Sequence, residues 1–120
     1  MKINIAKSAG FCFGVKRAVY TVYKLSSKKN VYTFGPIIHN DEVVADLERQ
    51  GVHVINDSED FKSLSEGTII IRSHGVSKAI YEEILNAGLD LVDATCPFVR
   101  KIHKIVERES RDGRVIIIIG

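Results

Sequence analysis

The sequence predicts an α/β fold in which helices cover both faces of a mostly parallel sheet. Short runs rich in β-branched residues alternate with amphipathic helical segments along the whole chain. This alternation is typical of βαβ units, whose strands lie parallel. At 120 residues, with 45% hydrophobic and 27% charged residues, the chain has an ordinary globular composition and can bury a core.

The expected elements follow from periodicity and from cap residues. The first half predicts a strand at 2–6, a helix at 14–26, a strand at 31–34, a helix capped by Asn40 and ended by Gly51, and a strand at 52–55. The second half predicts a polar connection at 56–66, a strand at 68–72, a helix capped by Ser77 and stopped by Gly88, a strand at 89–92 and a helix at 97–111. Asn and Ser side chains accept a free backbone N–H at a helix start, and Gly readily adopts the left-handed turn that ends a helix.

The last residues of the sequence are unusual for a chain end. Residues 115–119 are five consecutive β-branched residues, which predict a buried parallel strand. A loop and a helix normally follow such a strand. We therefore expect this chain to be the front part of a longer protein.

Charge and hydropathy exclude several classes of partner. The net charge is +2, and the Lys and Arg residues are scattered, so we expect neither a nucleic-acid nor a membrane surface. The first residues resemble a strand and not a signal peptide. The apolar run at 115–119 is too short to cross a bilayer. We expect a cytoplasmic protein with reduced thiols, in which the cysteines act as ligands more readily than as a disulfide.

The two cysteines, Cys12 and Cys96, both fall where a helix is expected to begin. Pro97 suits the first helical position because its missing N–H needs no partner there, which places Cys96 at or beside the N-cap. Gly14 opens a second helix directly after Cys12. Free N–H groups and the positive end of the helix dipole stabilise a thiolate, the form that binds metal or attacks. Matched settings predict one shared site.

Two other strand-to-helix loops carry His39 and His74. Ligands of open α/β sheets bind beyond the carboxyl ends of the strands, so all four loops are expected to open at one edge. Beside helix N-termini, the two imidazoles would suit an anion such as phosphate, although each could instead bond to the backbone. His53 falls in a strand and His103 on the solvent side of a helix, and neither is assigned a role.

Other interpretations of the cysteines stay open at this point. Free cysteines are often small buried hydrophobic residues. A zinc site made from two Cys and two His lacks the close ligand pairs of structural zinc motifs, but a scattered site remains possible. A ferredoxin-type motif is excluded because no Cys-x-x-Cys is present. Residues 10–14 match neither a dinucleotide fingerprint nor a phosphate-binding P-loop.

Four motifs together resemble those of the 4-hydroxy-3-methylbut-2-enyl diphosphate reductase family. These are iron–sulfur enzymes that close the methylerythritol phosphate route to isoprenoids. The motifs are residues 10–15 (GFCFGV), 39–40 (HN), 73–76 (SHGV) and 93–97 (DATCP). They occur in the order and at the spacing of the family, and the resemblance runs from Met1 to Gly120.

This resemblance implies three similar α/β domains around a central 4Fe-4S cluster. Residues 1–96 would form the first domain, and residues 97–120 would open the second. Cys12 and Cys96 would be two of the three cysteine ligands of the cluster, which leaves one iron open to substrate. His39 and His74 would bind the substrate diphosphate. The third cysteine and the acidic proton donor would lie beyond Gly120, so no catalytic residue is expected within this chain.

The implied reaction is the two-electron reductive removal of the allylic hydroxyl of 4-hydroxy-3-methylbut-2-enyl diphosphate. It yields isopentenyl and dimethylallyl diphosphates, with electrons from a ferredoxin or flavodoxin. Two thiolates would hold a four-iron cluster poorly, so we expect activity from the complete protein and not from this chain alone. The alternative function is a non-redox α/β module that binds a phosphorylated ligand through His39, His74 and helix N-termini.

Overall fold

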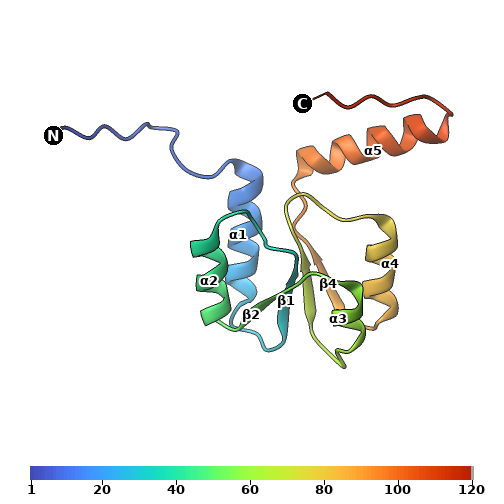
Figure 1. Ribbon diagram of the computed structural model, residues 1–120, viewed down its shortest axis with the longest axis horizontal. Coiled ribbons are helices and arrows are strands. Elements are labelled where there is room, and N and C mark those ends of the chain that lie inside the picture. Colours follow the sequence, from blue (N-terminus) through green and yellow to red (C-terminus); the bar gives the residue numbers. More distant parts are fainter. Residues whose placement is uncertain (120) are drawn as a thin grey trace.

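A computed structural model describes residues 1–119 and confirms the predicted α/β class. It contains a four-stranded parallel sheet between two layers of helices (Figure 1). The elements in chain order are α1 (Phe13–Leu25), β1 (Val31–Phe34), α2 (Asp41–Arg49), β2 (Val52–Ile55), α3 (Ser58–Lys62), β3 (Thr68–Ile71), α4 (Lys78–Asn86), β4 (Asp90–Asp93) and α5 (Pro97–Arg111). The strand order is β2-β1-β3-β4.

The chain runs outward from the centre of the sheet in both directions. The β1-α2-β2 unit leads to one edge, and the β3-α4-β4 unit leads to the other. Parallel crossovers share one hand, so opposite directions place their helices on opposite faces. Helices α1 and α2 cover one face, and α3 and α4 cover the other (Figure 1). The connections after β1 and β3 therefore diverge at the middle of the sheet.

The core lies on both sides of the central strand β3. All four of its residues are buried. Ile70 packs with α1 and α2 on one face, whereas Ile69 packs with α3 and α4 on the other. Burial of each such side chain stabilises the fold by about 1.5–3 kcal/mol. A strand buried on both faces explains why three consecutive isoleucines follow Thr68 without alternation of apolar and polar residues.

The helix ends follow the predicted caps. The Asn40 side chain accepts the Val43 N–H at 3.0 Å at the start of α2, and the Ser77 hydroxyl accepts the Ile80 N–H at 3.4 Å at the start of α4. Glycines in the left-handed region, with φ values of 85° and 74°, follow α2 and α4 at positions 51 and 88. The polar connection contains the short helix α3.

Two predicted strands, at residues 2–6 and 115–119, are wrong. Both segments lie within residues 1–119, but neither forms a strand, and their isoleucines are mostly exposed. A strand needs backbone hydrogen bonds to a neighbouring strand. Both segments instead extend from the body of the fold without such a neighbour (Figure 1). The division into residues 1–96 and 97–120, and the three-domain arrangement, stay predictions.

Helix α5 has the predicted bounds but lies at the periphery of the fold (Figure 1). All its residues are at least partly exposed, including Phe98, Ile102 and Ile105 on its apolar side. Within residues 1–119, no helix is both long enough and apolar enough to cross a bilayer.

Candidate functional site

The loops after β1 and β3 carry His39 and His74, and these loops meet at the centre of the sheet. The two strands are neighbours, and the chain leaves them in opposite directions. Such a point of divergence forms the crevice in which open α/β sheets bind ligands. The two imidazole rings lie 5.7 Å apart, centroid to centroid, and both residues are exposed. This pair can be reached by an anion from solvent.

The two cysteines are the N-cap residues of α1 and α5, as expected for Cys96 beside Pro97. Both are free thiols, Cys12 exposed and Cys96 half-buried. A Cβ added to Gly14 would lie 2.5 Å from the Cys96 Sγ, so this sulfur lies directly against the first turn of α1. The rings of Phe13 and Phe98 also meet edge to face, 6.4 Å apart. The structure thus brings together the two helix starts that carry the cysteines.

Backbone hydrogen bonds connect the cysteine loop with the histidine loop. The Cys96 N–H donates to the carbonyl of Ser73 at 2.9 Å, and Ser73 directly precedes His74. On the other side, Arg17 Nη1 donates to the carbonyl of Thr95 at 3.1 Å. The cysteine pair and the histidine pair therefore share one edge of the sheet.

Asp93 joins the end of β4 to the first turns of α5. Its Oδ1 accepts the Thr95 N–H at 2.8 Å, and its Oδ2 accepts Arg100 Nη2 at 2.7 Å and the Tyr81 hydroxyl at 3.4 Å. Its side chain is 19% exposed. Burial of Tyr81, the charge of Asp93 and the hydrogen bond between these two side chains together raise the pKa of Tyr81 above its ordinary value. The phenol donates to Asp93 in its protonated form.

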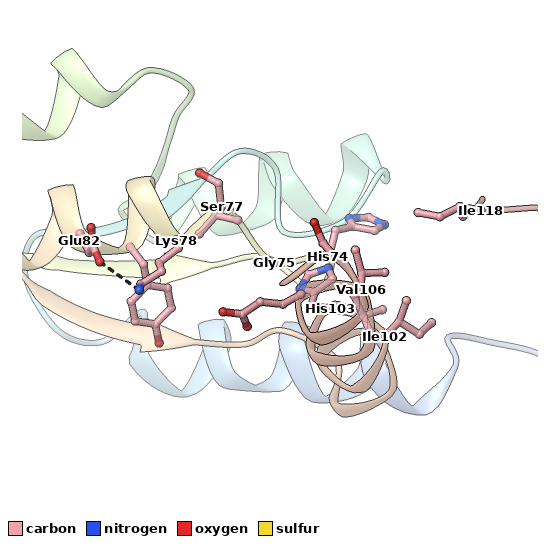
Figure 2. A pocket seen from close by; sticks show the side chains of 14 residues that line it. His74, Gly75, Ser77, Lys78, Glu82, Ile102, His103, Val106 and Ile118 are labelled. Atoms are coloured by element: carbon pink, nitrogen blue, oxygen red, sulfur yellow. Dashed lines mark ion pairs between the residues drawn. The ribbon is translucent and has the colours of Figure 1, made fainter. Parts of the chain in front are cut away.

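An open groove of about 1020 Å³ lies between α4 and α5 (Figure 2). His74 lines it, together with His103. The His103 ring lies beside Gly75, because a Cβ added there would be 2.9 Å from the His103 Cε1 (Figure 2). Lys78 and Glu82 form an ion pair of 3.7 Å at its far end. The groove extends the histidine site along α4.

Sequence reasoning placed some residues near the site and missed others. His53, to which no role was assigned, is exposed on the edge strand β2. His103 is exposed as expected, but it also borders the same groove as His74. Arg17 was not singled out. The one feature of the sequence that could have indicated Arg17 is its position directly before Ala18, a buried residue on the apolar face of the helix.

The described residues supply two thiol donors to this site and no larger metal-binding set. Among residues 1–119, no three His, Cys, Asp or Glu side chains gather in a way that could hold a metal ion. Thiolates are the usual ligands of iron–sulfur clusters, which take three or four of them. The donor chemistry of Cys12 and Cys96 fits such a cluster, and their number fits a part of its ligand set.

Comparisons with known proteins show which family this chain resembles along its length. A family model described as LytB protein matches residues 3–120. Proteins named 4-hydroxy-3-methylbut-2-enyl diphosphate reductase match the whole chain. The one from Alkaliphilus oremlandii is 47% identical over 43% of its own length, and the one from Geobacter sulfurreducens is 47% identical over 42% of its length. The chain thus spans about two fifths of the length of the curated relatives it matches.

Solved structures of similarly named proteins share the fold. One, described as (E)-4-hydroxy-3-methyl-but-2-enyl diphosphate reductase, the terminal enzyme of the non-mevalonate pathway, has a TM-score of 0.79 and 41% identity. The match covers 98% of this chain and 42% of that one. The reductase from Plasmodium falciparum has a TM-score of 0.80 and 35% identity over 88% of this chain and 33% of its own. With a family model that covers all but its first two residues, this chain belongs to the LytB protein family.

Proposed function

We propose that the complete protein to which this chain contributes is a 4-hydroxy-3-methylbut-2-enyl diphosphate reductase. In the reaction, the allylic C–O bond breaks, one C–H bond forms, and two electrons and two protons are consumed as the hydroxyl leaves as water. The products are isopentenyl and dimethylallyl diphosphates. Membership of the LytB family and the names of its relatives support this proposal. The observation that carries it is a thiol pair and an imidazole pair at one sheet edge, linked through Ser73 and Cys96.

Cys12 and Cys96 would hold a 4Fe-4S cluster together with a third cysteine from the remainder of the complete protein. The fit of Cys96 Sγ against Gly14 supports this assignment, since the helix leaves room for a sulfur at its first turn. When bound, the cluster supplies electrons and a Lewis-acidic iron for the allylic hydroxyl.

His39 and His74 would bind the diphosphate end of the substrate. When protonated, their imidazoles form charge-assisted hydrogen bonds to phosphate oxygens. The N-termini of α2 and α4 begin in the same loops and add partial positive charge. Held at this end, the substrate keeps its allyl group in one orientation relative to the cysteine pair, which lowers the entropic part of the barrier.

The electrons would come from a ferredoxin or flavodoxin, because protein side chains provide no comparable reductant. We place the reaction in the cytoplasm, where thiols remain reduced. The proton donor would come from the remainder of the complete protein.

A crossed set of variants tests the proposal in the complete protein purified without oxygen. Cys12→Ser and Cys96→Ser are expected to lose most iron and acid-labile sulfide and the visible absorption of the cluster. His39→Ala and His74→Ala are expected to keep the cluster but to weaken substrate binding by about tenfold or more, because each removes a charge-assisted bond worth about 1.5–3 kcal/mol. Iron and sulfide analysis, visible spectra and calorimetric titration with substrate measure these effects. His53→Ala, on the edge strand, is the matched control.

Two results would contradict this assignment. Colourless wild-type protein, even after anaerobic reconstitution with iron and sulfide, would exclude the cluster. If the histidine variants then lost phosphate binding while the cysteine variants retained it, the non-redox phosphate-binding module would replace the reductase as the function. Metal bound without colour would instead indicate zinc.

A further inference from the structure

The peptide group between Thr95 and Cys96 is held at both of its polar atoms. Its carbonyl accepts Arg17 Nη1 from α1 at 3.1 Å, in a partly buried contact between residues 78 positions apart. Its N–H donates to the carbonyl of Ser73 at 2.9 Å. Because a peptide is planar and rigid, two such bonds fix its plane. The Cys96 Cα belongs to that plane, so the point from which the thiol extends is fixed as well.

Helix α1 contributes three features to the cysteine site. Cys12 is its N-cap, Gly14 provides the surface on which the Cys96 sulfur rests, and Arg17 follows one turn later. The bond from Arg17 connects the helix that carries one cysteine to the peptide that carries the other.

We infer that Arg17 is a positioning residue that fixes Cys96 relative to Cys12 and raises the reduction potential of a cluster bound there. The cluster part of this inference rests on the proposed function; the positioning part does not. The physical basis is twofold. The guanidinium offers rigid planar donors to the Thr95 carbonyl, and it carries a positive charge. Positive charge near an iron–sulfur cluster favours its reduced, more negative form.

Neighbouring Lys16 provides a matched control. It lies on the same helix, carries the same charge and is exposed, whereas Arg17 is half-buried. A loss of helix propensity or of net charge affects both positions alike. The loss of the bond to Thr95 is specific to Arg17, and methionine at position 17 keeps an apolar stem in its half-buried place.

The test compares Arg17→Met, Arg17→Lys and Lys16→Met in the complete protein. Amide hydrogen exchange of the peptide containing Cys96, measured by mass spectrometry without cluster, reports on positioning. In Arg17→Met the Thr95 carbonyl loses one hydrogen bond, which lowers the free energy needed to open this peptide locally. We therefore expect the Cys96 amide to exchange about tenfold faster, the effect of one lost hydrogen bond. A redox titration followed by electron paramagnetic resonance on the loaded protein should show a lower midpoint potential in Arg17→Met. Arg17→Lys keeps the positive charge but not the planar donors. Its midpoint potential should therefore lie closer to the wild-type value than its Cys96 exchange rate does.

The possible outcomes separate the claims. Wild-type exchange at Cys96 in Arg17→Met, or the same acceleration in Lys16→Met, would overturn the positioning role. An unchanged midpoint potential in Arg17→Met would overturn the electrostatic role. If circular dichroism shows that Arg17→Met is unfolded, Arg17→Lys decides the positioning role. Accelerated exchange of its Cys96 amide supports the inference, and exchange at the wild-type rate overturns it. If the wild-type protein holds no cluster, the proposed function and the electrostatic role both fall, while hydrogen exchange still decides the positioning role.

Discussion

At the scale of single residues, the site depends on a missing side chain. Gly14 is buried in the first turn of α1, and a Cβ there would lie 2.5 Å from the Sγ and 2.8 Å from the Cβ of Cys96. Real Cβ atoms essentially never approach other atoms so closely, so either the helix or the cysteine loop would have to move. A glycine inside a helix costs about 1 kcal/mol relative to alanine. Space for the sulfur explains why the helix carries this cost.

Gly14→Ala tests this account, because helix propensity and packing predict opposite signs. Propensity alone predicts stabilisation by about 1 kcal/mol. We expect net destabilisation by about 1–3 kcal/mol, since overpacking dominates. Urea unfolding of the 120-residue chain, followed by circular dichroism, measures the change. In a Cys96→Gly background the obstructing atoms are gone, and Gly14→Ala should become stabilising. Destabilisation in both backgrounds would mean that the sulfur contact is not the cause.

At the scale of elements, caps position the loops that carry the histidines. Asn40 follows His39 and accepts the Val43 N–H at 3.0 Å, whereas Ser77 makes the corresponding bond to Ile80 at 3.4 Å. The shorter bond lies closer to the preferred hydrogen-bond distance. The acidic residues at the start of α2 add favourable charge at its N-terminus, and α4 has none in its first turn.

We therefore expect Asn40→Ala to cost about 1 kcal/mol of unfolding free energy, and Ser77→Ala to cost less. Asn40→Asp, which keeps an accepting oxygen, should be close to neutral. Chemical denaturation of the three variants measures these differences. An equal or larger loss in Ser77→Ala would show that bond length at the cap does not rank the two helices.

At the scale of the whole molecule, burial is distributed unevenly. Strand β3 is buried on both faces, while every residue of α5 is at least partly exposed, and residues 1–12 are fully outside the core. Local opening requires the least free energy where few apolar contacts are broken. The central strand and the peripheral helix should therefore differ greatly in stability, although both are regular hydrogen-bonded elements.

Hydrogen exchange on the 120-residue chain should reveal this order. We expect amides of β3 to exchange only through global unfolding and amides of α5 to exchange at least about a hundredfold faster, through local opening. The measurement is repeated at lower protein concentration as a control for self-association. A second molecule could cover exposed apolar side chains such as Phe98 and Ile102 and so protect α5. Protection of α5 equal to that of β3 in dilute solution would contradict the distribution of burial described above.

The local pattern of the sequence determined the type and limits of most elements. The β-branched run of β3, the caps at Asn40 and Ser77, and Pro97 at the start of α5 each restrict nearby backbone angles, so they can be recognised without knowledge of the rest of the chain. The same reasoning assigned the site candidates to helix starts and loops. It determined which residues could share an edge, but not which of them touch.

Only the tertiary structure decided which segments become partners. The patterns at 2–6 and 115–119 have strand character, yet neither segment forms a strand, because strand formation also requires a neighbour at the right register. The strand order placed His39 and His74 side by side, and the packing of α1 brought Arg17 to the Thr95 carbonyl. Such contacts depend on the complementarity of surfaces far apart in the chain. Periodicity and capping act over a few neighbouring residues, so they carry no information about which distant segments pack together.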